Sequence, residues 1–221
     1  MPQHTAPLMA RIDTAVDTRA MLRHPFYTAW TAGELDFDVL GDYARQYFAF
    51  ERAFPTYLSG IHTRIDDPSS RKAVLANLID EEAGDTNHQE LWLQFAETVG
   101  AERDSVVGAD LLDTTQDLLD TFAAAVDAGP DTGLAALYAY ESQASAVATS
   151  KLDGLARFYG ISDGPGTTFF TTHESMDEWH AESERETITS LSRNDEDTLA
   201  AAESAAGALW GFLDGVQAAY C

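Results

Sequence analysis

Residues 173–180 read His173-Glu-Ser-Met-Asp177-Glu-Trp-His180, inside a stretch of helical periodicity over 167–192. Positions four and seven residues apart lie on one face of an α-helix, so His173, Asp177 and His180 are expected to project together. Two imidazoles flanking a carboxylate suit a divalent transition metal. The alternative is an ordinary solvated helix face. The chain has only six histidines, however, and two of them stand at this spacing, which favours a metal site. The segment therefore predicts a metal-binding helix.

Helical periodicity also dominates the sequence on either side of this segment, and alternating, strand-like runs are absent. A length of 221 residues suits one domain with a substantial core. The sequence therefore predicts an all-α fold, a compact bundle of seven or eight helices that forms one metal-binding domain over residues 1–221. The segment His24-Pro25 is expected to break the chain after the first helix, because proline disfavours helix in the residue before it. Pro55 is expected to kink the second helix. The expected helices span residues 8–22, 36–65, 68–83, 87–100, 109–127, 131–159, 167–192 and 194–218.

Two further helices offer metal donors. Glu81 and His88 are seven residues apart, so they can share a helix face, although adjacent acids in so acidic a chain are often surface groups. Glu141 interrupts an apolar stretch, and a buried carboxylate requires a partner charge or a metal. A salt bridge, for which Lys151 is eligible, is the alternative. Three carboxylates and three imidazoles from three segments match a dinuclear centre within a bundle.

The charge balance is strongly acidic: 37 Asp and Glu stand against 13 Lys and Arg, for a net charge of −24. Nucleic acid and anionic lipid bind through basic patches, so neither is expected as a partner. Acids spread along a chain repel one another, and about 1 M salt shortens the screening length to roughly 3 Å. We therefore expect a cytosol of high ionic strength in a salt-loving source. A large acidic surface for a cationic partner is the alternative.

The single cysteine, Cys221, excludes an internal disulfide, a Cys-rich zinc site and a buried cysteine nucleophile. No stretch approaches the roughly 18 apolar residues that a membrane span needs. Residues 1–22 also lack the continuous apolar segment of a secretory signal. We expect a cytoplasmic protein with no membrane partner.

Several motifs between Met21 and Leu213 resemble those of the haem-oxygenase-like dimetal oxidases and oxygenases, a superfamily that shares its fold with TenA-type thiaminases and PqqC. Within it, the chain is most similar to the branch of the chlamydial protein associating with death domains. The motifs are His24-Pro-Phe-Tyr-Thr-Ala-Trp-Thr-Ala-Gly-Glu-Leu35, Ala53-Phe-Pro-Thr-Tyr-Leu-Ser-Gly-Ile-His62, Asp80-Glu-Glu-Ala-Gly84 with Asn87-His88 and Leu91-Trp92, Ala136-Leu-Tyr-Ala-Tyr-Glu-Ser-Gln143, Lys151-Leu-Asp-Gly-Leu155 and the histidine motif above.

The resemblance implies a haem-oxygenase-like bundle and an oxygen-dependent oxidoreductase of p-aminobenzoate and folate biosynthesis. It implies that Tyr27 supplies the aromatic ring and Lys151 the amino group, in a single self-sacrificing turnover. Tyr43 and Tyr140 match other aromatic residues near the family's cavity. The residues alone leave Tyr27 as an ordinary packed aromatic. They leave Lys151 either as a surface lysine or as a residue that points into the same cavity. The six metal ligands that the resemblance implies are Glu81, His88, Glu141, His173, Asp177 and His180.

The expected cofactor is a pair of iron(II) ions. Zinc, manganese or a mixed manganese–iron pair are the alternatives, because the order of affinities among divalent metals does not favour iron. Dioxygen and an external reductant are the expected co-reactants, and a homodimer the expected assembly. The alternatives are an oxidase of the same fold that acts on an external small molecule, and a non-enzymatic regulator. Thiaminase chemistry is disfavoured because its nucleophilic cysteine is missing here. A complete ligand set disfavours a cofactor-free oxidase of the PqqC type.

Overall fold

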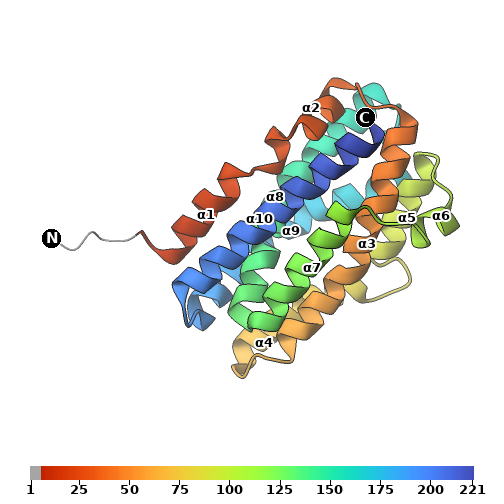
Figure 1. Cartoon of the computed structure of the whole chain (residues 1–221). Coiled ribbons are helices and arrows are strands. Elements are labelled where there is room, and N and C mark those ends of the chain that lie inside the picture. The colour runs from red at the N-terminus through yellow and green to blue at the C-terminus, as the bar shows by residue number, and fades with distance from the viewer. Residues whose placement is uncertain (1–5) are drawn as a thin grey trace.

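The computed structural model describes residues 6–221, apart from the side chains of residues 175–179. Every regular element within these limits is helical, which confirms the all-α prediction. The long helices run side by side, nearly along one axis (Figure 1). In chain order the elements are α1 (Leu8–Thr18), the 3-10 turn η1 (Met21–Arg23), α2 (Pro25–Ala32), α3 (Phe37–His62), α4 (Pro68–Glu82), α5 (His88–Thr98), α6 (Arg103–Val107), α7 (Asp113–Ala128), α8 (Pro130–Phe158), α9 (Pro165–Leu191) and α10 (Asp195–Tyr220).

The eight helices expected from periodicity are present, and the structure adds two short ones, α2 and α6, and the turn η1. The sequence correctly indicated a break at His24-Pro25, but a new helix starts there. Pro25 occupies the first helical position, where its fixed φ is favourable and its missing N–H is not needed. The Nδ1 atom of His24 accepts the backbone N–H of Phe26 at 3.0 Å and so caps α2.

Side-chain caps start several of the long helices where the sequence places Asp or Asn. Asp36, Asp67, Asn87 and Asn194 each accept a backbone N–H from the first turn of α3, α4, α5 and α10, respectively. Such a bond satisfies one of the four N–H groups that a helix start leaves without an intrahelical acceptor. The cap at Asp67 starts α4 at Pro68, the first residue of the helix predicted over 68–83.

Helix α8 lies at the centre of the bundle and packs most extensively against α9 and α10. Every residue from Asp131 to Glu141 is buried, as expected of a helix covered on all sides. Two charged residues of α8, Glu141 and Lys151, are each 3% exposed. No helix of the described chain is long and apolar enough to span a bilayer.

A glycine brings α2 close to α8. A Cβ atom at Gly154 would lie 2.6 Å from the indole of Trp30, so only glycine allows this approach without a shift. The indole Nε1 of Trp30 donates to the backbone oxygen of Lys151 at 3.4 Å. The short helix that carries Tyr27 is thereby held against the segment that carries Lys151.

Candidate metal centre and buried amine

The five described residues of the predicted ligand set come from four helices and are buried. Each of these residues is between 2% and 4% exposed. Removing so many ionisable groups from water is unfavourable unless they are paired or bind a metal. Asp177 belongs to α9, but its side chain lies outside the described residues, so its role stays a prediction. The described residues of the set are Glu81 at the end of α4, His88 at the start of α5, Glu141 in α8, and His173 and His180 in α9.

Donor atoms of these residues face one another across the helices. The Nδ1 atom of His88 lies 3.5 Å from Oε2 of Glu81. The Nδ1 atom of His180 lies 3.9 Å from Oε2 of Glu141. The rings of His88 and His173 are 4.7 Å apart at their centroids. The prediction that Glu81 and His88 share one helix face is wrong, because α4 ends at Glu82 and α5 begins at His88. The packing of the bundle nevertheless brings groups from α4, α5, α8 and α9 together.

The donor set fits divalent transition-metal ions. The separations of 3.5 and 3.9 Å exceed the usual hydrogen-bond length. Two donors bound to one ion at about 2.0–2.2 Å, at a right angle, lie roughly 3 Å apart, so a small inward movement suffices. Burial, followed by the neighbouring His173, lowers the pKa of His88 to about 3, which keeps the imidazole in the neutral form that binds metal. Among the described side chains, no three His, Cys, Asp or Glu residues are already close enough together to bind one metal ion. The side chain of Asp177 is not among those described.

Hydrogen bonds from α4 reach two of these residues. Asn77 Nδ2 donates to Oε1 of Glu141 at 2.9 Å. Asp80 Oδ2 lies 3.1 Å from Nε2 of His180. Neither Asn77 nor Asp80 was predicted, because the sequence does not show which face of α4 packs against α8 and α9.

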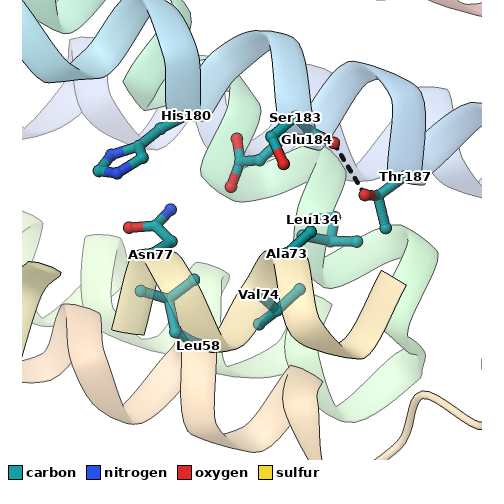
Figure 2. Close-up of a pocket in the computed structure, with 9 residues that line it drawn as sticks. All are labelled: Leu58, Ala73, Val74, Asn77, Leu134, His180, Ser183, Glu184 and Thr187. Carbon is teal, nitrogen blue, oxygen red and sulfur yellow. Dashed lines mark hydrogen bonds between the residues drawn. The ribbon is translucent and has the colours of Figure 1, made fainter. Parts of the chain in front are cut away.

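A small cavity of about 10 Å³ lies beside His180, between α4 and α9. Figure 2 shows His180 and Glu184 extending from α9 toward Asn77 on α4. Glu184 is only 4% exposed and was also missed. It follows His180 by one helical turn, so continuing the spacing of the histidine motif places it on the same face of α9.

A second buried cluster surrounds the amine of Lys151. Lys151 Nζ donates to the hydroxyl of Tyr43 at 2.7 Å. The Tyr43 hydroxyl lies 3.4 Å from that of Tyr27. Burial lowers the pKa of Lys151 to about 7, partly offset by the carboxylate of Glu51. The amine lies within 6 Å of the ring centroids of Tyr27, Trp30, Tyr43, Tyr47, Trp92 and Phe170.

The tyrosines of this cluster are protonated near neutral pH. Burial is the main cause that raises the pKa of Tyr27, Tyr43 and Tyr47 above its ordinary value. Tyr47 and Tyr140 share a hydrogen bond of 2.5 Å between their hydroxyl groups. The sequence indicated Tyr27, Tyr43 and Tyr140, whereas Tyr47 is an additional member.

One cavity links this cluster to α9, the helix predicted to bind metal. Its volume is about 20 Å³, and its walls include Tyr27, Tyr140, Lys151 and His173. The interpretation of Lys151 as a surface lysine is therefore wrong. The amine of Lys151 donates a hydrogen bond to Tyr43, whereas Glu141 contacts Asn77 and His180. The predicted ring source, amine donor and a histidine ligand face the same small space.

The sequence profile of a family described as iron-containing redox enzymes matches residues 41–212. A 4-aminobenzoate synthase of Nitrosomonas europaea is 42% identical, over 96% of this chain and 91% of its own length. A 4-aminobenzoate synthase of Chlamydia muridarum is 39% identical, over 92% of this chain and 87% of its own.

Solved structures support the fold. A TenA homologue from Pseudomonas syringae superposes with a TM-score of 0.80 at 14% identity, covering 96% of this chain and 91% of its own. A CADD-like protein from Nostoc punctiforme gives a TM-score of 0.69 at 17% identity, covering 96% and 100%. With buried imidazoles and carboxylates in place and the family profile matched over most of its length, the chain belongs to the haem-oxygenase-like family of iron-containing redox enzymes.

Proposed function

We propose that this enzyme makes 4-aminobenzoate in an oxygen-dependent reaction, with the ring of Tyr27 as the carbon source and Lys151 as the nitrogen donor. The names of the relatives from Nitrosomonas europaea and Chlamydia muridarum support the product. The cavity shared by Tyr27, Lys151 and His173 supports the source of its atoms. The metal pair is held by Glu81, His88, Glu141, His173, Asp177 and His180, and iron fits the family best.

The chemistry of a tyrosine side chain suits this product. Its ring carries Cβ opposite the hydroxyl group, and 4-aminobenzoate carries a carboxyl carbon opposite an amino group. The hydroxyl of Tyr27 therefore marks the position at which nitrogen must arrive. The Tyr43 hydroxyl lies 3.4 Å from it and holds Lys151 Nζ at 2.7 Å. This placement of the amine at the hydroxyl end of Tyr27 is the observation that carries the proposal.

The environment of Lys151 supplies a reactive amine. A lysine in water is almost entirely protonated at neutral pH, and an ammonium group has no lone pair to form a bond. With its pKa lowered to about 7, roughly half of the Lys151 side chains are free amines near neutrality. Tyr43 accepts the amine's hydrogen bond and can exchange a proton with it. When bound, the metal pair supplies the electrons that reduce dioxygen.

The size of the cavity distinguishes this proposal from action on an external small molecule. A space of about 20 Å³ holds one or two water molecules and no aromatic substrate. A reactant that is already a side chain of the protein needs no such space. The structure thus favours the internal source.

A variant pair tests the role of Tyr27. The protein is reconstituted anaerobically with iron(II) in high salt, then given reductant and oxygen, and 4-aminobenzoate is measured. Tyr27→Phe should abolish the product while the iron content stays the same. Tyr57→Phe is the matched control, because Tyr57 is also a buried tyrosine and its hydroxyl bonds to the backbone oxygen of Leu119, outside the cavity. Product from Tyr27→Phe at the level of the control would disprove the self-sacrificing reaction.

We also propose that the enzyme works in a cytosol of high ionic strength. The net charge of −24 supports this proposal, because salt screens the repulsion among the acids. We further propose that the enzyme is a homodimer and uses an external reductant. Sedimentation in 1 M KCl measures the assembly, and a monomer there would contradict the dimer.

A further inference from the structure

Helix α4 contributes more to the candidate metal centre than the ligand Glu81. Two polar side chains of the same helix, Asn77 and Asp80, each contact one ligand from a different helix. Asn77 Nδ2 donates to Oε1 of Glu141 on α8. Asp80 Oδ2 meets Nε2 of His180 on α9. Figure 2 shows Asn77 on α4 opposite the ring of His180.

The contact with Asp80 decides the tautomer of His180. A neutral imidazole carries one N–H, and its other nitrogen has a lone pair that can bind a metal. A carboxylate only accepts hydrogen bonds, so the nitrogen at 3.1 Å from Asp80, Nε2, carries the proton. In the neutral ring, Nδ1 then carries the lone pair, and it is Nδ1 that lies 3.9 Å from Oε2 of Glu141. The donor nitrogen of His180 is therefore directed toward the other ligands.

The contact with Asn77 selects an oxygen of Glu141 in the same way. Asn77 is 4% exposed, and its amide nitrogen donates to Oε1 of Glu141 at 2.9 Å. The other oxygen, Oε2, is the one directed at Nδ1 of His180. Both contacts thus leave the atoms that face each other, Nδ1 and Oε2, as the donors.

We propose that Asp80 and Asn77 are positioning residues that make His180 bind metal through Nδ1 and Glu141 through Oε2. The inference rests on the proposed metal centre but not on the product that it forms. Hydrogen bonds of this kind fix the ring orientation of a histidine ligand and increase its basicity, and their loss weakens metal binding about 10- to 100-fold. Helix α4 thereby orients ligands of both α8 and α9.

Nitrogen NMR of the full-length protein labelled with ¹⁵N-histidine tests the tautomer directly. The chain has only six histidines, and a His180→Gln variant identifies the signals of His180. In the metal-free protein, His180 should carry its proton on Nε2. Addition of zinc(II), a diamagnetic probe, should shift the signal of Nδ1. A proton on Nδ1, or a zinc-dependent shift at Nε2, would overturn the proposal.

Variants extend the test with a matched control. Asp80→Asn should give a mixture of His180 tautomers and weaken zinc(II) binding about 10- to 100-fold, measured by competition with a chelator. Glu82→Gln removes one charge from the exposed side of the same helix and should change neither. An Asp80→Asn protein with unchanged tautomer and unchanged affinity would contradict the positioning role. The wild-type spectra decide the tautomer even if this variant does not fold. The tautomer of His180 and the zinc(II) affinity can both be measured even if the protein forms no 4-aminobenzoate.

Discussion

Lys151 is one of two lysines in the chain, and the other, Lys72, is exposed. Lys151 is 3% exposed and surrounded by aromatic rings, with the hydroxyl of Tyr43 as its hydrogen-bond acceptor. Burial is unfavourable for its charged form, which is why its pKa falls to about 7. Burial of this side chain therefore lowers the stability of the protein at neutral pH. In the proposed reaction, the same burial provides the free amine.

The stability of the metal-free protein should depend on pH through Lys151. The unfolded chain holds the lysine proton up to about pH 10.5, whereas the folded chain releases it near 7. The unfolded state binds more protons between these values, so stability rises with pH there, by up to about 1.4 kcal/mol per pH unit. The free energy of unfolding, measured in denaturant at pH 7.5, 8.5 and 9.5, should rise relative to that of Lys151→Met. Lys72→Met should show no such slope. A constant difference between wild type and Lys151→Met would contradict a neutral buried amine.

At the scale of an element, α2 places Tyr27 and is held at its start by His24. The Nδ1 atom of His24 caps the helix, and Nε2 donates to Asp214 on α10 at 3.0 Å. Burial lowers the pKa of His24, which favours the neutral ring that this pair of bonds requires. The helix has eight residues, too few to be stable without such tertiary contacts.

Removal of the cap should destabilise the protein. His24→Ala removes a buried ring and the cap, and loss of a side-chain cap alone costs about 1 kcal/mol. His24→Asn can keep the capping bond, since asparagine is a favoured cap. Denaturant unfolding should place His24→Asn between wild type and His24→Ala. Equal stability of the two variants would show that the cap itself contributes nothing.

The helices also show what the sequence could predict and what it could not. Periodicity identified the eight long helices and placed His173 and His180 on one face of α9, because both are properties of a single segment. It missed α2, since a proline break looks the same whether or not a new helix follows. It missed Asn77, Asp80 and Glu184 because their roles depend on which helices pack together. Their spacing alone does not distinguish them from the many surface acids and amides of the chain.

At the scale of the whole molecule, the chain carries 37 Asp and Glu residues against 13 Lys and Arg. Repulsion among the acids opposes the compact state, and salt screens it. The unfolding temperature should therefore rise as KCl increases toward 1 M, by about 2–4 °C for each kcal/mol of repulsion removed. Sucrose is the control. It stabilises proteins because it is excluded from their surface, but it is uncharged and does not screen charges. Equal unfolding temperatures with and without KCl would contradict the high-salt expectation.

The molecule as a whole brings His173 of α9, Tyr27 and the buried Lys151 to one small cavity. The central proposal is that Lys151 gives up its nitrogen. The most direct measurement is a single turnover of Lys72→Arg protein that is labelled with ¹⁵N only in lysine, so that Lys151 is the sole labelled lysine. Iron(II), reductant and oxygen are added, and the mass of 4-aminobenzoate is recorded. The account predicts ¹⁵N in the product, at no more than one molecule per chain. Unlabelled 4-aminobenzoate, or more than one molecule per chain, would contradict it.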